Sequence, residues 1–208
     1  ILETLREELG GFTLISEELG ILHGGQPIII VDPVDGSLNA SRGSPFYSIS
    51  IAVALRPSLH EVVAGVVHAP SLAMTFTAVR GGGAYLNGAR ISSRVFAESR
   101  KVIGLASPTG FHYEVGRTVS LLMKRGYKVR ILGSASLGVC LSSIGSLDAY
   151  LDPWKSLRPF DVAAACLVAR EAGCKVILSS DKLDLRARLS IKVFRSEALL
   201  SELEKILL

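Results

Sequence analysis

Cysteine is scarce in this sequence of 208 residues, and its scarcity limits the kinds of site and compartment to consider. The three cysteines, Cys140, Cys166 and Cys174, form no CxxC pair and lie in largely apolar stretches. An odd and dispersed set of this kind predicts neither a disulfide framework nor a zinc site. We therefore expect the chain to work in a reducing cytoplasm.

Long apolar runs, basic runs and repeats are missing as well. No apolar run reaches the roughly 18 residues that a membrane span requires, and the first residues lack the pattern of a signal peptide. Lysine and arginine are scattered, so the net charge of +4 favours small anionic ligands over nucleic acid. Without a linker or a fixed repeat, the sequence predicts one compact unit with no membrane partner.

The sequence is rich in apolar residues, at 49%, and in short segments separated by glycine and proline. Strand-like segments in the first half are 27–31, 46–55, 62–68 and 74–79. The second half alternates strand-like segments 102–106, 128–132, 147–151 and 176–178 with helix-like segments 114–125, 135–144, 160–172 and 197–208. We predict an α/β fold in layers, with a largely antiparallel sheet in residues 1–100 and an α/β half in residues 101–208.

The most informative stretch is Asp32-Pro33-Val34-Asp35, which follows a buried β-branched run. Residues at i and i+3 face opposite sides of a regular strand, so the motif predicts a turn between Asp32 and Asp35. Such a turn would bring both carboxylates and the Val34 carbonyl toward one point, where they suit a hard cation such as magnesium. The alternative is a simple Asx-type turn with two solvated aspartates.

The next residues indicate an anion site. Gly36 lets the backbone approach a ligand, and Ser37 is a good helix N-cap. The following amides, including that of Leu38, would then point outward at an anion.

Two further acidic residues lie beside apolar segments. Glu17 follows the run 12–15, at the end of a predicted strand, and so offers a third acidic ligand. Asp161 precedes the apolar helix at 162–165. The alternatives are a charged loop for Glu17 and a helix-capping role for Asp161, where a carboxylate favours the positive helix end.

Together these acidic stretches resemble the inositol monophosphatase family, especially the archaeal-type members that also accept fructose 1,6-bisphosphate. The resemblance lies in Glu17-Glu18, in the motif at 32–37, in Phe160-Asp161-Val162-Ala163-Ala164 and in the turn at 171–174. The glycine-rich stretch 80–88 is similar to a hairpin of the family. The family's fold is an α/β sandwich of alternating helix and sheet layers, which the resemblance implies for one domain spanning residues 1–208.

The resemblance also implies a magnesium site with two to three ions, carried by the first half and closed by the second. Glu17, Asp32 and the Val34 carbonyl would hold one ion. Asp32, Asp35 and Asp161 would hold a second, and a third, weaker ion would lie near Glu17.

The implied reaction is hydrolysis of a small sugar or cyclitol phosphate monoester by activated water. Glu17 and the Ser37 hydroxyl would be the catalytic groups that orient the water. The implied substrate contacts are Asp35, Gly36, Ser37, Leu38, Ala135, Asp152 and Arg158. Arg158 and Lys155 would meet the second phosphate of a bisphosphate, with an exposed basic loop as the alternative.

Three further expectations follow from the resemblance. Family members carry additional N-terminal residues with two helices, so we expect this chain, which starts at Ile1, to lack that layer and to expose apolar sheet surface. A homodimer is implied. The competing functions are a 3'-phosphoadenosine 5'-phosphate phosphatase and a non-catalytic metal- or anion-binding member of the fold.

Overall fold

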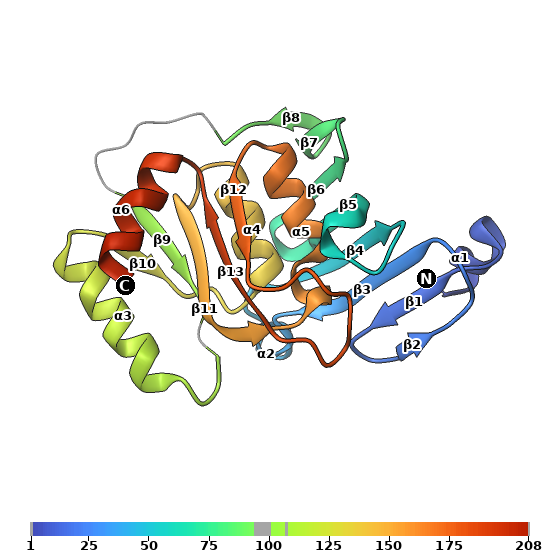
Figure 1. The fold of residues 1–208 in the computed structure, drawn as a ribbon, viewed down its shortest axis with the longest axis horizontal. Helices are drawn as coiled ribbons and strands as arrows, with labels where there is room; N and C mark the ends of the chain where they lie inside the picture. Colours follow the sequence, from blue (N-terminus) through green and yellow to red (C-terminus); the bar gives the residue numbers. More distant parts are fainter. Residues whose placement is uncertain (1, 94–100, 107, 208) are drawn as a thin grey trace.

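The computed structural model describes residues 2–93, 101–106 and 108–207, whose strands form two sheets (Figure 1). The larger sheet has eight strands in the order β2-β1-β3-β4-β5-β6-β7-β8. They are β1 (Thr13–Ser16), β2 (Gly20–Leu22), β3 (Ile28–Asp35), β4 (Ser48–Ala54), β5 (Val62–Ala69), β6 (Met74–Val79), β7 (Gly83–Leu86) and β8 (Ala89–Ile91). The smaller sheet has five strands in the order β10-β9-β11-β13-β12. They are β9 (Val102–Leu105), β10 (Lys128–Arg130), β11 (Ala149–Leu157), β12 (Lys175–Leu178) and β13 (Leu189–Phe194).

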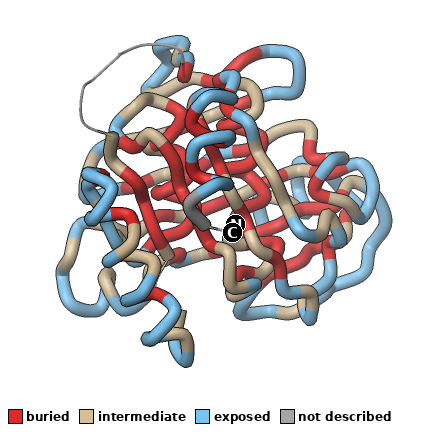
Figure 2. The backbone as a smooth tube through the Cα atoms, turned by 60° about the vertical axis from the view of Figure 1, so that its left-hand side comes forward, coloured by how far each residue is buried: buried red, intermediate tan, exposed pale blue. Residues whose placement is uncertain are grey.

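Helices alternate with the two sheets in layers. The apolar helices α4 (Ala135–Ser143) and α5 (Pro159–Glu171) lie between the sheets and share one large core with their inner faces. Helices α3 (His112–Lys124) and α6 (Glu197–Leu207) cover the far face of the smaller sheet, over a second core. The remaining helices are α1 (Leu2–Leu9), α2 (Ser37–Ser41), η1 (Leu59–Glu61) and η2 (Pro70–Leu72). Figure 2 shows the buried residues concentrated in the sheets and in the helices between them.

This arrangement confirms the predicted α/β class with alternating layers. The larger sheet is antiparallel, as expected, except that β1 and β3 run parallel. Several boundaries differ from the prediction. The strand predicted at 46–55 is confined to 48–54, and the strand predicted at 147–151 starts at 149 and continues to 157. The buried carboxylate of Asp152 explains that extension, because it accepts hydrogen bonds from Trp154 N and Ser156 Oγ across an irregularity in β11.

The outer face of the larger sheet carries apolar side chains. Helix α1 contributes Leu5 to a small third core there. On the neighbouring strands, Ile51 and Val53 are half-buried and Val66 is 37% exposed. These apolar side chains of β4 and β5 are therefore only partly covered in the described part of the chain.

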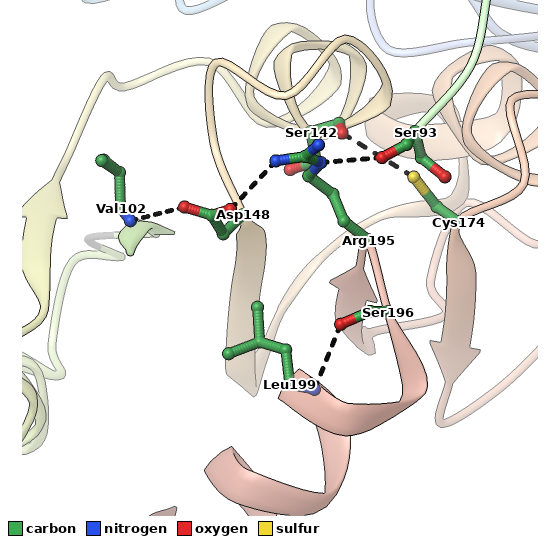
Figure 3. A network of polar contacts seen from close by, with 8 residues as sticks. All are labelled: Ser93, Val102, Ser142, Asp148, Cys174, Arg195, Ser196 and Leu199. Carbon is green, nitrogen blue, oxygen red and sulfur yellow. Dashed lines mark hydrogen bonds and ion pairs between the residues drawn. The ribbon is translucent and has the colours of Figure 1, made fainter. Parts of the chain in front are cut away.

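A half-buried polar network fastens the smaller sheet to its surroundings (Figure 3). The Arg195 guanidinium donates to Asp148 Oδ1 at 3.0 Å and to the Ser93 carbonyl at 3.0 Å. The second Asp148 oxygen accepts from the Val102 amide at 2.7 Å. These contacts join the starts of β9 and β11 to the end of β13. In the described part of the chain, no helix is long and apolar enough to cross a membrane.

Candidate active site

Glu17 and Asp32 come together because β1 and β3 are parallel neighbours. Ser16, the last residue of β1, pairs with Val31 within β3. The next residue along each strand, Glu17 just after β1 and Asp32 still within β3, therefore lies at the same level of the sheet. Asp32 is buried, at 2% exposure, whereas the Glu17 side chain is exposed at the rim.

Asp32 and Asp35 lie on one side of β3 because the strand contains a bulge. Asp32 pairs with Ser50 and Asp35 pairs with Ser48, so three steps along β3 oppose two along β4. The extra residue shifts the alternation of side chains between the two faces of the strand. Both carboxylates therefore face inward, while Val34 is exposed. The predicted turn between the two aspartates is therefore wrong, because the bulge reorients the side chains without ending the strand.

The glycine after Asp35 makes the chain's sharp entry into α2 possible. Gly36 has φ +90°, and a Cβ there would lie 3.0 Å from the Gly133 carbonyl oxygen and 3.1 Å from the Phe46 carbonyl oxygen. A larger residue would therefore be strained and crowded. Gly36 is the N-cap of α2 and Ser37 is its first residue, with no side-chain capping bond. The prediction of Ser37 as N-cap is wrong, because the left-handed glycine already occupies that position.

Asp161 enters the same region from the start of α5. Its Oδ2 accepts the Arg158 backbone N–H at 2.8 Å, so the capping role considered for Asp161 is real. The Arg158 guanidinium lies 5.5 Å from the centre of the Phe160 ring and 3.4 Å from Glu17 Oε1. Arg158 thus connects the start of α5 to the end of β1.

The acidic side chains influence one another's protonation. The pKa of Asp32 is raised to about 8, mainly by burial and in addition by the nearby charges of Asp35, Asp161 and Glu17. Burial also raises the pKa of Asp161 to about 7, against the lowering effect of the hydrogen bond from the Arg158 N–H. The four carboxyl groups therefore lie close enough to interact, with Asp32 and Asp35 buried, Asp161 half-buried and Glu17 exposed at the rim.

These groups do not yet form a coordination sphere. Among the described residues, no group of three or more acidic, histidine or cysteine side chains has metal-holding geometry. In three of the four carboxylates one oxygen already has a protein donor: Asp32 Oδ1 accepts from Val34 N, and Glu17 and Asp161 each accept from Arg158. Their second oxygens and the Val34 carbonyl are hard donors of the type that magnesium prefers, and a cation would offset the mutual repulsion. The donor set fits magnesium.

Two of the predicted substrate contacts are deeply placed. The Ala135 N–H donates to Asp35 Oδ1 at 3.1 Å, so it already has a protein partner. Asp152 is completely buried, and burial raises its pKa, against the lowering effect of the hydrogen bonds from Ser156 and Trp154. Its contact with substrate stays a prediction. Leu38, at 70% exposure, and Arg158 lie in more accessible positions.

Sequence reasoning missed the polar residues that hold this region together. Asn39 Nδ2 donates to the carbonyls of Phe46 and Leu132, at 2.6 and 2.7 Å, and so fastens α2 to the segment before α4. Ser48 and Ser136 are fully buried beside Asp35. The signal available in the sequence was a serine at an inward position of an otherwise apolar strand.

An open pocket of about 650 Å³ lies along one face of α3, and none of the predicted site residues lines it. Its lining residues are His112, Tyr113, Gly116, Arg117, Ser120, Leu121 and Lys124. We therefore place the candidate site at the carboxylates and not at this pocket.

Comparison with known proteins agrees with the geometry. A model of the inositol monophosphatase family matches residues 1–206. The fructose-1,6-bisphosphatase/inositol-1-monophosphatase of Methanothermobacter thermautotrophicus is 39% identical over 174 residues, which are 77% of this chain and 61% of that relative. The Nus factor SuhB of Pasteurella multocida is 33% identical over 182 residues, covering 83% of this chain and 65% of the relative. The solved structure of the Thermotoga maritima IMPase superposes with a TM-score of 0.83 at 30% identity, over 99% of this chain and 78% of that one.

Proposed function

The chain belongs to the inositol monophosphatase family, and from this premise we propose that it hydrolyses small phosphate monoesters with the help of magnesium. The observation that carries the proposal is the approach of four carboxyl groups, from the end of β1, from β3 and from the start of α5, three of them buried or half-buried and Glu17 at the exposed rim. As substrates we propose inositol 1-phosphate and fructose 1,6-bisphosphate, since the Methanothermobacter relative is named for both activities.

Two to three magnesium ions are proposed for this region. One would be held by Glu17, Asp32 and the Val34 carbonyl. A second would be held by Asp32, Asp35 and Asp161, and a third, weaker one would lie near Glu17. When bound, magnesium lowers the pKa of water and stabilises the charge on the phosphoryl group.

The protein's own groups would position the water and the phosphate. Glu17 and the Ser37 hydroxyl are proposed to orient the attacking water. The first turn of α2 has N–H groups without partners inside the helix, and these would face the phosphate. The proposed substrate contacts are Asp35, Gly36, Ser37, Leu38, Ala135, Asp152 and Arg158.

Arg158 is proposed to change partner when the site is loaded. Its guanidinium lies 3.4 Å from Glu17 Oε1, where it supplies the positive charge that a cation would otherwise supply. A magnesium ion bound by Glu17 would weaken that ion pair. The released guanidinium is suited to phosphate oxygens, including a second phosphate of a bisphosphate.

A non-catalytic role is the second candidate. Two observations favour it: the similarity to a protein named as a Nus factor, and the lack of ready metal-holding geometry among the described residues. A 3'-phosphoadenosine 5'-phosphate phosphatase remains the enzymatic alternative, and phosphate release from that nucleotide would distinguish it.

The test is phosphate release from inositol 1-phosphate and fructose 1,6-bisphosphate, with magnesium and with a chelator. Asp32→Asn removes a shared ligand at constant shape, and Glu18→Gln makes the same charge change at the exposed neighbour of Glu17. We expect magnesium-dependent release that is lost in Asp32→Asn and kept in Glu18→Gln. Equal turnover in Asp32→Asn and the parent chain would refute the proposed mechanism, and no release from either substrate would favour the non-catalytic role.

We further propose that residues 1–208 form one domain, with residues 1–100 carrying the metal site and 101–208 closing it. A homodimer is proposed on the family resemblance, and a cytoplasmic location on the cysteine content. Sedimentation velocity would measure the first of these two properties directly.

A further inference from the structure

Three buried serine hydroxyls surround the carboxylate of Asp35. Ser134 and Ser136 come from the start of α4, and Ser48 comes from β4, directly opposite Asp35 in the sheet. Their exposures are 3%, 0% and 0%. Hydroxyl groups are costly to bury without hydrogen bonds, so the positions of these three need an explanation.

The number of available protons fixes the direction of the hydrogen bonds. The Ser134 and Ser136 hydroxyls lie 2.6 and 2.5 Å from Asp35 Oδ2, and a carboxylate oxygen can only accept. Both hydroxyl protons are therefore used. Ser48 Oγ lies 2.8 Å from Ser136 Oγ and 3.1 Å from Ser134 Oγ, so the Ser48 hydroxyl must be the donor to one of them, and Ser136 is the nearer.

The two oxygens of Asp35 are consequently unequal. Oδ2 accepts from the hydroxyls of Ser134 and Ser136 and also from the Ser136 N–H at 2.7 Å. Oδ1 has one partner among the described residues, the Ala135 N–H at 3.1 Å. A carboxylate offers about two acceptor positions on each oxygen. Oδ2 is therefore saturated, and Oδ1 keeps a free acceptor position.

We propose that Ser136, supported by Ser48, is a positioning residue that fixes Asp35 so that Oδ1 alone can bind magnesium. This inference rests on the proposed function, because it takes Asp35 as a ligand. The chain of donors from Ser48 through Ser136 strengthens each bond in turn, since a hydroxyl that accepts a hydrogen bond becomes a better donor. The carboxylate is thus held in one orientation before a cation arrives.

The test compares serine-to-alanine substitutions in magnesium binding and in turnover. Ser136→Ala and Ser48→Ala remove the two hydroxyls, and Ser48→Thr keeps the hydroxyl on a residue that suits a strand. Ser142→Ala is the matched control, because Ser142 is also fully buried on α4 but bonds only the Gly138 carbonyl through its hydroxyl among the described contacts. Isothermal titration calorimetry gives the magnesium Kd, and thermal unfolding in a chelator reports the fold.

We expect the magnesium Kd to rise about tenfold in Ser136→Ala, the usual cost of losing a group that orients a metal ligand. Ser48→Ala should raise it about threefold, since that hydroxyl acts through Ser136. Ser48→Thr and Ser142→Ala should bind magnesium like the parent chain. At saturating magnesium, kcat of Ser136→Ala should recover most of its loss.

A purely structural role would give a different pattern. Ser136→Ala would then lower the unfolding temperature as Ser142→Ala does and leave the Kd unchanged, which overturns the inference. If Ser136→Ala does not fold, Ser48→Ala, which does not touch Asp35, decides the question by the same Kd measurement. A parent chain that binds magnesium but releases no phosphate would defeat the proposed function while the Kd comparison still tests this inference. A parent chain that binds no magnesium would overturn both.

Discussion

Replacing Asp32 with asparagine tests the electrostatics of the candidate site at almost constant side-chain shape. Asp32 is 2% exposed, and its pKa is raised to about 8 by burial and by three neighbouring carboxyl groups. In the metal-free protein, ionisation of this group is therefore unfavourable. The asparagine has no charge to bury and should relieve the repulsion.

The sign and size of the effect follow from proton linkage. The folded-state pKa lies above the unfolded value of 3.8, so the folded protein holds the proton through a range where the unfolded chain has lost it. The contribution of Asp32 to the free energy of unfolding is therefore fully present below about pH 4 and is lost as the pH rises to about 8. A pKa difference of one corresponds to about 1.4 kcal/mol, which sets an upper limit of about 6 kcal/mol. Asp161, whose pKa is raised to about 7, shares the repulsion. We therefore expect the stability change due to Asp32 to be about half of this upper limit.

Urea unfolding in a chelator, at about pH 5 and about pH 9, measures this difference. Between these two conditions the limit is about 4 kcal/mol, because part of the difference is already lost at about pH 5, so the parent chain and the control Glu18→Gln should lose about 2 kcal/mol more than Asp32→Asn. At the higher pH, millimolar magnesium should make the parent chain more stable than Asp32→Asn. An ion that binds only the folded state stabilises it, and the variant lacks a carboxylate shared by two of the proposed ions. If the parent chain and Asp32→Asn show the same pH dependence in the chelator, Asp32 does not carry the buried charge that we describe.

Three other substitutions test the surroundings of the carboxylates. Arg158→Gln frees the partly exposed Glu17 and should lower the magnesium concentration for half-maximal activity about threefold. It should also raise KM for fructose 1,6-bisphosphate about tenfold. Steady-state kinetics with inositol 1-phosphate and fructose 1,6-bisphosphate measures these two effects. Asn39→Ala leaves two backbone carbonyls without their donor and should lower the free energy of unfolding by about 2–4 kcal/mol in urea titrations. Gly36→Ala meets both a left-handed backbone and a close carbonyl, so we expect a loss of about 2 kcal/mol or more and no phosphate release; an active, stable variant would contradict the crowding.

The sequence was sufficient to predict the layers and the acidic residues that end its strands. A buried β-branched run that stops at Asp32 is a local signal, and so is the apolar run before Glu17. Their proximity was not a local signal, because it depends on the parallel pairing of β1 with β3 inside a mostly antiparallel sheet. The resemblance to a family supplied that link.

Long-range hydrogen bonds and local backbone detail escaped prediction. The partners of Asp35 lie about a hundred residues away, and nothing in the spacing of Ser134 and Ser136 indicates that they contact it. Where a turn was predicted after Asp32, the structure has a bulge. A regular strand would place Asp32 and Asp35 on opposite sides, and the sequence does not show whether a turn or a bulge breaks that regularity. Gly36 and not Ser37 is the N-cap of α2. Glycine and serine both favour that position, so the residue types alone did not decide between them.

The distribution of compensating charge explains how a cluster of carboxylates can exist in the folded, metal-free chain. Asp35 accepts hydrogen bonds from donors at the start of α4, and Asp161 accepts the amide of Arg158, the N-cap residue of its own helix. Asp32 has only the Val34 amide among the described contacts and is the group whose pKa rises furthest in this cluster. A cation would therefore gain most from Asp32, while Asp35 and Asp161 keep the protein donors that already orient them. The site thus combines an Asp35 carboxylate held in place by hydrogen bonds with an Asp32 whose ionised form has little compensation from the protein, and a cation should stabilise that ionised form.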